Sequence, residues 1–414
     1  MKIALVFPKS TFLETPLVFP PLGLFYIAAR LESLGHTTEF FDLNVDDFPE
    51  DAYDEIWVSA TSPQMAEIKR IGKIVKDYDA KSVLGGAGAW ANPSSCMDLD
   101  YDLVVGGEAD EPENIKKILA TEKGYLLCPV SKTLDWVLPP VRRWSWKYNS
   151  QLTGFDGIKV PATTAFNTRG CPLMCAFCES GRHGVIWSEL TRYEPLNVVE
   201  FQLAQMTMMG YKGVFFYDDV KPLNKKRMLE ELELYKQYEI MWRCFLRSDI
   251  VNKQGGREYL EQMRDAGLVE IFVGVESASN EIKDNIHKKT TIEQDTNIVR
   301  WCKDLGIRCK TSFILGLPGE SHTTMEETRR WILEHRPERV QVGRLIPFKG
   351  TPLGDHPENF DLNYDEQPPD EWFYSGDYGM GTKSFVSTSH LTRDEIDVFW
   401  HSLMDELKRE GIPS

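Results

Sequence analysis

The chain has 414 residues, of which 42% are hydrophobic and 27% charged, so it is long enough for roughly two or three globular domains and is not mainly disordered. Its 47 basic and 63 acidic residues give a formal net charge of −16, which disfavours nucleic acid and anionic membranes as main partners. No apolar stretch is long enough to span a membrane, and the N-terminus lacks a secretory signal pattern. We therefore expect a cytoplasmic protein.

Strand and helix patterns alternate over the first 125 residues. Short buried-strand patterns occur at 2–7, 39–43, 55–60, 82–84 and 102–105, with helical patterns between them. Such alternation predicts a doubly wound parallel sheet, whose ligands bind at the carboxyl ends of the strands.

Glycines follow two of these strands. Gly85, Gly86 and Gly88 come after one, and Gly106, Gly107 and Glu108 come after the next. Glycine lets a backbone approach a bulky ligand closely, and it also makes tight turns. These residues are candidate cofactor-binding residues, and the turn interpretation stays open beside that role.

Three of the eight cysteines lie within eight residues, at Cys171, Cys175 and Cys178. This C-x₃-C-x₂-C spacing can hold three corners of one iron–sulfur cluster and leave one iron open for another ligand. Two alternatives are a zinc site closed by a fourth ligand such as His183, and a chance cluster of buried thiols. We expect the other five cysteines to be core residues: Cys96, Cys128, Cys244, Cys302 and Cys309.

The residues around the triad resemble the radical SAM signature. They are Arg169-Gly170-Cys171-Pro172, the x₃/x₂ order of the cysteines and Phe177 before the last one. The resemblance covers about Pro161 to Leu353 and implies a partial (β/α)₆ barrel that binds a [4Fe–4S] cluster and S-adenosylmethionine at the carboxyl ends of its strands. Strand patterns fit at 161–166, 213–217, 242–246, 270–275, 308–315 and 339–345.

The same resemblance implies two groups for the methionine end of S-adenosylmethionine. Asp218 or Asp219 would accept hydrogen bonds from the amino group, and Arg247 would pair with the carboxylate. The alternatives are that one aspartate caps the following helix, and that Arg247 forms a surface ion pair with Asp249 or Glu276.

It also implies cofactor contacts on later strands. Glu276 and Ser277 would reach the methionine end or the ribose, and the backbone of Gly316 and Gly319 would pack on adenine. A plain turn before a helix near His322 is the alternative for the two glycines. No single catalytic residue is predicted.

The N-terminal segment resembles the cobalamin-binding domain that precedes many radical SAM barrels. The resemblance rests on the order of residues 19–24, 42–44, 85–89 and 105–108. Better-known cobalamin domains carry a cobalt-ligating histidine after the first strand, where this chain reads Pro8-Lys9-Ser10-Thr11-Phe12-Leu13. We therefore expect cobalamin without a protein imidazole as the lower axial ligand, and a domain that has lost the cofactor stays an alternative.

We predict four parts: a cobalamin-binding-like Rossmann-type domain at 1–125, a linker at 126–159, a radical SAM partial barrel at 160–353 and a small C-terminal cap at 354–414. The cap ends in a helical pattern from Thr392 to about Gly411. Its aromatic residues either close the barrel mouth or only pack as a lid: Trp372, Phe373, Tyr374 and Tyr378.

The two resemblances imply an enzyme that methylates an unactivated carbon of a small molecule or peptide. It would use a 5′-deoxyadenosyl radical, methylcobalamin and an external one-electron reductant. A radical SAM enzyme that performs ring formation or rearrangement, with or without cobalamin, is one alternative. A zinc-stabilised binding protein without catalysis is another. The sequence predicts no oligomeric state.

Overall fold

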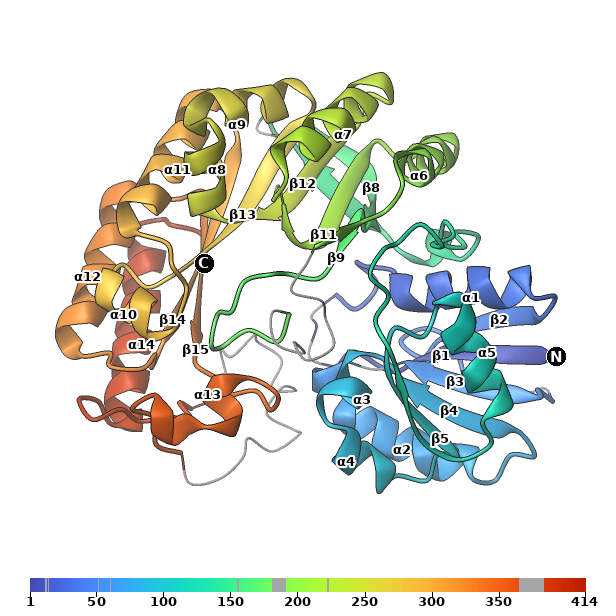
Figure 1. The fold of residues 1–414 in the computed structure, drawn as a ribbon. Helices are drawn as coiled ribbons and strands as arrows, with labels where there is room; N and C mark the ends of the chain where they lie inside the picture. Colours follow the sequence, from blue (N-terminus) through green and yellow to red (C-terminus); the bar gives the residue numbers. More distant parts are fainter. Residues whose placement is uncertain are drawn as a thin grey trace.

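The computed structural model describes all of residues 1–414 except 12, 14, 51, 60, 155, 181–190, 222 and 365–382. Two sheets dominate the fold, as Figure 1 shows: sheet A, from the N-terminal part of the chain, and the larger, curled sheet B. The expected fold class is confirmed, since a doubly wound parallel sheet is followed by a half-barrel and a C-terminal helix.

Sheet A has six strands in the order β2-β1-β3-β4-β5-β6, all parallel. The strands are β1 (Lys2–Phe7), β2 (Thr37–Asp42), β3 (Glu55–Ser59), β4 (Lys81–Gly85), β5 (Leu103–Gly107) and β6 (Gly124–Cys128). The helices are α1 (Leu22–Ser33), α2 (Met65–Val75), α3 (Ala87–Ala91), α4 (Pro93–Met97) and α5 (Pro112–Ala120). The order reverses between β1 and β3, where doubly wound sheets bind ligands beyond the strand ends.

Each face of sheet A has its own hydrophobic core. One core joins α1 and α5 to the sheet, and the other joins α2, α3 and α4. Helix α1 begins directly after Pro20-Pro21, and Gly35 follows it with φ +84°. These residues start and end the helix, because proline suits a first turn and glycine adopts positive φ at little cost.

The segment expected as a linker contributes strands to both sheets. β6 pairs with β5, while β7 (Ser150–Thr153) pairs antiparallel with β8 (Lys159–Ala165). The sequence pattern missed β6 because it is a mostly exposed edge strand without alternating burial. The boundaries of the four predicted parts stay predictions.

Sheet B has the order β15-β14-β13-β12-β11-β8-β7, with every pair except β7–β8 parallel. The remaining strands are β11 (Gly213–Lys221), β12 (Met241–Leu246), β13 (Leu268–Glu276), β14 (Arg308–Leu315) and β15 (Arg339–Arg344). The helices are α6 (Leu196–Met208), α7 (Lys225–Gln237), α8 (Ser248–Gln254), α9 (Gly256–Asp265), α10 (Asn280–Asn285), α11 (Ile292–Leu305), α12 (His322–His335), α13 (Pro352–Asp355) and α14 (Arg393–Arg409). Short 3₁₀ turns occur at Ser62–Gln64, Ser145–Lys147 and Pro357–Asn359. Most of the helices line the outer side of the curled sheet in Figure 1.

The predicted C-terminal helix is confirmed as α14. Thr392 caps it, and the expected face packs into the core of sheet B through Ile396, Phe399, Leu403 and Leu407. The aromatic residues between 372 and 378 lie outside the described residues. Of the helices that the structure describes, none has the length and apolar character needed to cross a membrane.

Candidate active site

The cysteine triad lies on a loop that a two-stranded hairpin closes at its base. β9 (Thr168–Arg169) and β10 (Arg192–Tyr193) pair antiparallel, with Arg192 opposite Arg169. In Figure 1 the green segment that follows β9 lies in the central space between the two sheets. The Ala176 N–H donates to the Ile286 carbonyl (2.9 Å) and the Ala176 carbonyl accepts from Leu353 N–H (3.2 Å). These bonds fasten the loop to the carboxyl edge of sheet B.

The structure places the three cysteines on this loop, with Cys175 buried and Cys171 and Cys178 half-buried. Desolvation by burial raises the pKa of Cys171 to about 11. The five other cysteines are all buried, as expected.

Asp218 supports the base of the cysteine loop. Its buried carboxylate accepts from the Asn167 backbone N–H (2.9 Å) and from the Thr168 hydroxyl (2.5 Å), and it lies 3.3 Å from the Lys221 ammonium. Lys221 also donates to Glu231 at 2.8 Å. These contacts use the carboxylate inside the protein, so Asp218 orients the chain just before the first cysteine.

Asp219 is the accessible member of the pair. Its side chain is exposed, and its Oδ2 accepts from the Gly170 N–H at 3.2 Å, next to Cys171. Surrounding protein removes part of its solvation, and this is the largest cause of a raised pKa. The helix-cap alternative is wrong for both aspartates, because the Asn224 side chain caps α7 by accepting from Arg227 N–H.

Two cations surround Cys175. The Arg247 guanidinium donates to Cys175 Sγ (3.4 Å), to Asp249 Oδ1 (3.1 Å) and to the Lys288 carbonyl (2.5 Å). Arg247 does pair with Asp249, but the pair is buried and not on the surface as the alternative supposed. The Lys288 ammonium lies 2.7 Å from Glu276 Oε1. Although burial alone would lower the pKa of Lys288, the charge of Glu276 and, to a smaller extent, Cys175 raises it.

Glu276 and Ser277 form the strained end of β13. Glu276 is buried with φ +67°, a conformation rare for a residue with a Cβ. Its carboxylate folds back over Gly274, where a Cβ would come within 2.2 Å of Oε1. Ser277 is fully buried, and its hydroxyl accepts from Ser279 N–H at 3.2 Å. The ion pair with Lys288 thus holds Glu276 beside the cysteine loop. The hydrogen bond to Ser277 stabilises the turn after β13.

Gly316 and Gly319 form the turn after β14. Their φ values are +85° and +77°, and a Cβ at these positions would lie 2.9 Å from Val386 Cγ2 and 2.6 Å from Asn285 Nδ2, respectively. The buried carboxylate of Glu320 accepts from Gly316 N–H (2.5 Å) and Leu317 N–H (3.3 Å), and burial raises its pKa to about 8. The turn itself therefore requires both glycines.

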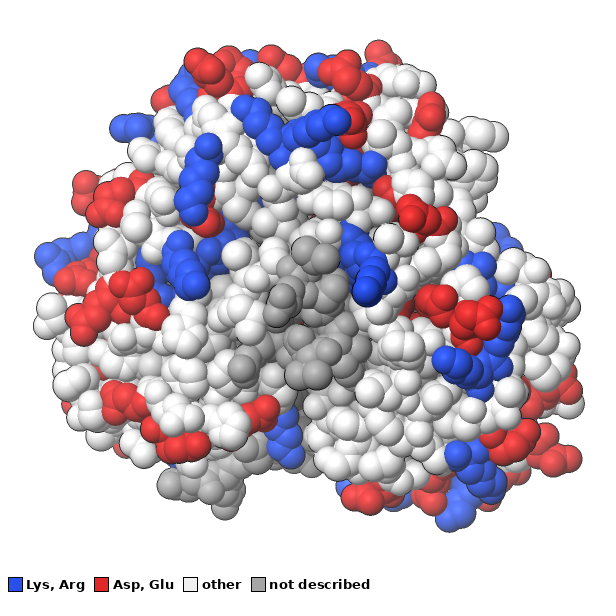
Figure 2. Space-filling view, viewed as in Figure 1, with Lys and Arg blue, Asp and Glu red and all other residues white. Residues whose placement is uncertain are grey.

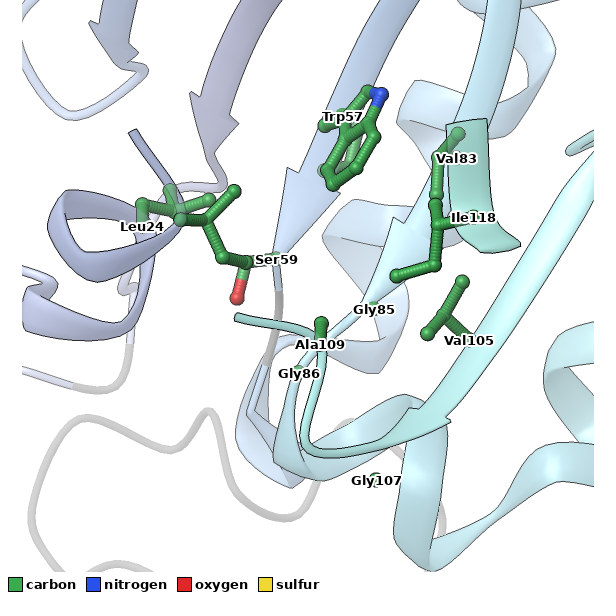
Figure 3. A pocket seen from close by; sticks show the side chains of 12 residues that line it. Leu24, Trp57, Ser59, Val83, Gly85, Gly86, Val105, Gly107, Ala109 and Ile118 are labelled. Atoms are coloured by element: carbon green, nitrogen blue, oxygen red, sulfur yellow. The ribbon is translucent and has the colours of Figure 1, made fainter. Parts of the chain in front are cut away.

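The carboxyl edge of sheet A contains a narrow apolar slot of about 30 Å³ (Figure 3). Ser59, Gly85, Gly86, Val105 and Gly107 border it at the strand ends, with Leu24, Trp57, Val83 and Ile118 among the side chains that line it. The loop glycines thus divide into two groups. Gly85 and Gly86 border the slot, whereas a Cβ at Gly88 or Gly106 would lie 2.8 Å from Thr61 C or 2.6 Å from Tyr125 Oη.

Gly107 and Glu108 connect this edge to the cysteine loop. Gly107 has φ +90°, and a Cβ there would lie 2.0 Å from the Cys128 carbonyl oxygen. Glu108 is buried and forms ion pairs with Arg169 and Arg192 at the base of the loop. His36 lies next to Thr37, the first residue of β2, at the amino edge and away from the slot.

The two halves match different protein families. The family model for the Radical SAM superfamily matches residues 167–332, and the model for the B12 binding domain matches residues 9–116.

The chain is a radical SAM enzyme with an N-terminal B12-binding domain.

Curated proteins match most of the chain at low identity. The anaerobic magnesium-protoporphyrin IX monomethyl ester cyclase of Rubrivivax gelatinosus is 24% identical over 389 residues, covering 83% of this chain and 68% of that protein. An uncharacterized methyltransferase of Pyrococcus horikoshii is 27% identical over 399 residues, covering 86% of this chain and 83% of that protein.

Among solved structures, the radical S-adenosylmethionine methyltransferase TsrM from Kitasatospora setae, with cobalamin and a [4Fe–4S] cluster bound, has the same fold. It superposes with a TM-score of 0.72 at 15% identity, over 99% of this chain and 90% of that one.

The two families imply three cofactors for this enzyme: a [4Fe–4S] cluster, S-adenosylmethionine and cobalamin. The side chains fit the cluster, because three thiols share one loop and one of them, Cys175, lies beside the cations Arg247 and Lys288. In the described part of the chain, no three His, Cys, Asp or Glu side chains are arranged to hold a single metal ion. His183, the fourth ligand of the zinc alternative, lies outside the described residues.

The edge of sheet A fits cobalamin through its lining. Glycine backbone and apolar side chains lie at the strand ends, so a large ligand can approach them closely, and any group larger than the slot of about 30 Å³ has to displace the loops around it. No histidine occurs in residues 37–182. The B12-binding domain therefore offers no imidazole at the edge where the slot lies.

Proposed function

We propose that this protein is a cobalamin-dependent radical SAM methyltransferase that acts on an unactivated carbon of a small molecule. The observation that carries the proposal is the contact between the two cofactor sites. Arg169, two residues before Cys171, pairs with Glu108 and Asp110, directly after the glycines of the slot. Ser62, on the loop after β3, donates to Glu179 next to Cys178 at 3.3 Å. An arrangement of this kind lets a radical form beside a methyl donor.

The chemistry needs few groups from the protein. When bound, the cluster and cobalamin supply one-electron reduction of S-adenosylmethionine and a transferable methyl group, respectively. Asp219 would accept hydrogen bonds from the α-amino group of bound S-adenosylmethionine. Arg247, which Asp249 and the Lys288 carbonyl hold in place beside Cys175, would pair with the α-carboxylate. Burial of these ion pairs keeps the arrangement rigid and excludes water.

The remaining site assignments follow from placement. Glu276 lies close enough to Lys288 and Cys175 to contact the methionine end, and the turn at Gly316 and Gly319 presents backbone toward adenine. At the slot, Gly85, Gly86 and Gly107 would contact cobalamin directly. Ser277, Gly88, Gly106, Glu108 and Asp218 would act through the residues that they position.

Two further features belong to the proposal. An external one-electron reductant supplies the electron, and a peptide is the alternative substrate to a small molecule. Lys and Arg are interspersed with Asp and Glu on the face shown in Figure 2, so neither charge sign dominates it. A cytoplasmic location, where thiols stay reduced, suits an oxygen-sensitive cluster.

The test needs no knowledge of the substrate. The protein is purified without oxygen, its cluster rebuilt, hydroxocobalamin added and the excess removed. We expect about four irons and about one cobalt per chain, as one cubane cluster and one corrinoid require. With reductant and S-adenosylmethionine, transfer of a methyl group to reduced cobalamin leaves S-adenosylhomocysteine, and reductive cleavage leaves methionine and 5′-deoxyadenosine.

Each outcome has a distinct meaning. S-adenosylhomocysteine that forms only when cobalamin is present supports methyl transfer. Iron without cobalt overturns the cobalamin role. 5′-Deoxyadenosine without S-adenosylhomocysteine, in protein that holds cobalt, overturns methylation and supports ring formation or rearrangement, in keeping with the cyclase relative.

A further inference from the structure

Glu108 joins both strands of the hairpin that closes the cysteine loop. Arg169 and Arg192 are register partners on β9 and β10. Arg169 Nη1 donates to Glu108 Oε1 at 3.1 Å, and Arg192 Nη1 donates to Oε2 at 2.7 Å. One carboxylate thus neutralises two cations that face each other across the hairpin.

Arg169 also contacts a second carboxylate and two aromatic rings. Asp110 accepts two hydrogen bonds from the guanidinium, at 2.8 and 2.7 Å. The guanidinium lies 5.0 Å from the Tyr26 ring centroid and 5.5 Å from that of Trp136. A bidentate, stacked arginine has little orientational freedom, so the first strand of the hairpin is held at a fixed position relative to the loop after β5.

The pairs are buried enough for their geometry to matter. The side chains of Glu108 and Arg192 are each 1% exposed. Loss of one partner of a buried pair leaves an uncompensated charge, and here it would leave two arginines opposite each other. Movement of Glu108 therefore has to move the hairpin, or break these contacts.

Glu108 also follows directly on Gly107, which borders the slot of sheet A. A ligand that enters the slot and displaces the β5 loop acts on Glu108 through one peptide unit. The hairpin strands, in turn, lead into the segment of the three cysteines. The residue thus lies between two ligand sites and needs no contact with either ligand.

We propose that Glu108 is a positioning residue that couples occupancy of the slot by cobalamin to the arrangement of the cysteine loop. This inference rests on the proposed function, since it takes cobalamin and the cluster as the two ligands. Coupling between binding sites is reciprocal, so loading of the cluster must change the affinity for cobalamin by the same factor as cobalamin changes retention of the cluster.

The experiment measures that factor. The dissociation constant of hydroxocobalamin is determined by anaerobic equilibrium dialysis, with a cobalt assay, for the full chain with and without its cluster. We expect the wild-type chain to bind about fivefold or more tightly when the cluster is loaded. Glu108→Gln should still bind hydroxocobalamin, but with a ratio of the two dissociation constants close to one.

A matched control is Glu113→Gln. Glu113 is exposed in the first turn of α5 and forms an ion pair with Lys116 at 2.7 Å. It makes the same chemical change five residues away and should keep the wild-type ratio. A residue with a merely structural role would weaken both affinities together and leave the ratio unchanged, which would overturn the coupling.

A second variant tests the coupling if Glu108→Gln does not fold. Asp110→Asn removes charge from the bidentate partner of Arg169 and leaves both Glu108 pairs in place, so it should lower the ratio partially. In the wild-type chain, hydroxocobalamin should change the rate of hydrogen exchange in residues 168–178. In the variant with a lowered ratio, this change should be lost. Two results overturn the coupling: a ratio of one in the wild-type chain, or a wild-type ratio in whichever of Glu108→Gln and Asp110→Asn is soluble. If S-adenosylhomocysteine still forms, these results leave the proposed function intact. No hydroxocobalamin binding by the wild-type chain overturns the proposed function as well.

Discussion

The carboxyl edges of the two sheets offer their ligands different chemistry. At sheet A the slot is bordered by Gly85, Gly86 and Gly107 and by apolar side chains. At sheet B the strand ends carry the ionisable groups of Asp219, Arg247 and Glu276, and the loop of the three cysteines is bonded to this edge. Under the proposed function, one edge would recognise its ligand by close approach of backbone, and the other by charge and by metal ligation.

This difference separates the substitutions that should harm each site. An added side chain should damage the edge of sheet A and spare the edge of sheet B. Removal of a thiol or a charge should do the reverse. The B12-binding domain and the radical SAM domain can therefore be disabled one at a time.

The largest effect should come from Cys175→Ala. Loss of one of three thiolates should reduce iron from about four per chain to nearly none, and 5′-deoxyadenosine should no longer form. Hydroxocobalamin should still bind, because the slot of sheet A is untouched. Iron assay, product analysis and dialysis check this. The control is Cys302→Ala, in the buried core, and retention of full iron by Cys175→Ala would contradict the assignment.

The complementary change is Gly85→Val, which adds a side chain at the border of the slot. A Cβ here would meet the Val105 carbonyl oxygen at 3.8 Å, an ordinary contact, so the strand should fold. We expect the dissociation constant for hydroxocobalamin to rise about tenfold or more, which corresponds to about 1.4 kcal/mol, with iron unchanged. Gly23→Val, at an exposed glycine with no atom within 4 Å of its added Cβ, is the control. Unchanged cobalamin binding would place the ligand elsewhere.

A third prediction contrasts the two neighbouring aspartates of β11. Asp219→Asn should raise the KM for S-adenosylmethionine about tenfold, the equivalent of about 1.4 kcal/mol of binding, without lowering the melting temperature. Asp218→Asn should lower the melting temperature by several degrees and reduce iron retention, because Asn167, Thr168 and Lys221 lose a charged partner. Initial rates and thermal melts distinguish the two, and equal effects on KM would contradict the division of roles.

Glu320 should make the stability of the fold depend on pH, because burial raises its pKa to about 8. Between about pH 4.5 and 8 the folded chain keeps a proton that the unfolded chain has released, so its stability falls as the pH rises, by up to about 1.4 kcal/mol per pH unit. Glu320→Gln, which still offers an oxygen to Gly316 N–H, should flatten this slope. Urea unfolding at pH 5.5, 7 and 8 measures the slope, with Glu326→Gln, at a partly exposed residue of α12, as control. A slope equal to that of wild type would refute the assignment.

Local sequence patterns predicted much of the molecule. The six parallel strands of sheet B and the buried face of α14 follow from runs and periodicities within single segments. The cysteine spacing predicted a cluster loop, because all three thiols belong to one short stretch of chain. The sequence did not predict β6, because this exposed edge strand has no alternation of buried and exposed residues.

The roles of neighbouring residues depend on contacts between distant parts of the chain. Asp218 and Asp219 are adjacent and chemically identical, yet one is buried under residues 167 and 168 and the other is exposed beside Gly170. The sequence predicts Glu108 as a cofactor-binding residue, but its partners Arg169 and Arg192 lie 61 and 84 positions away. The sequence by itself determined most of the strands and helices, the cluster loop and the family. Only the tertiary structure decided which polar groups face a ligand and which hold the two sites together, because partners so far apart leave no local periodicity.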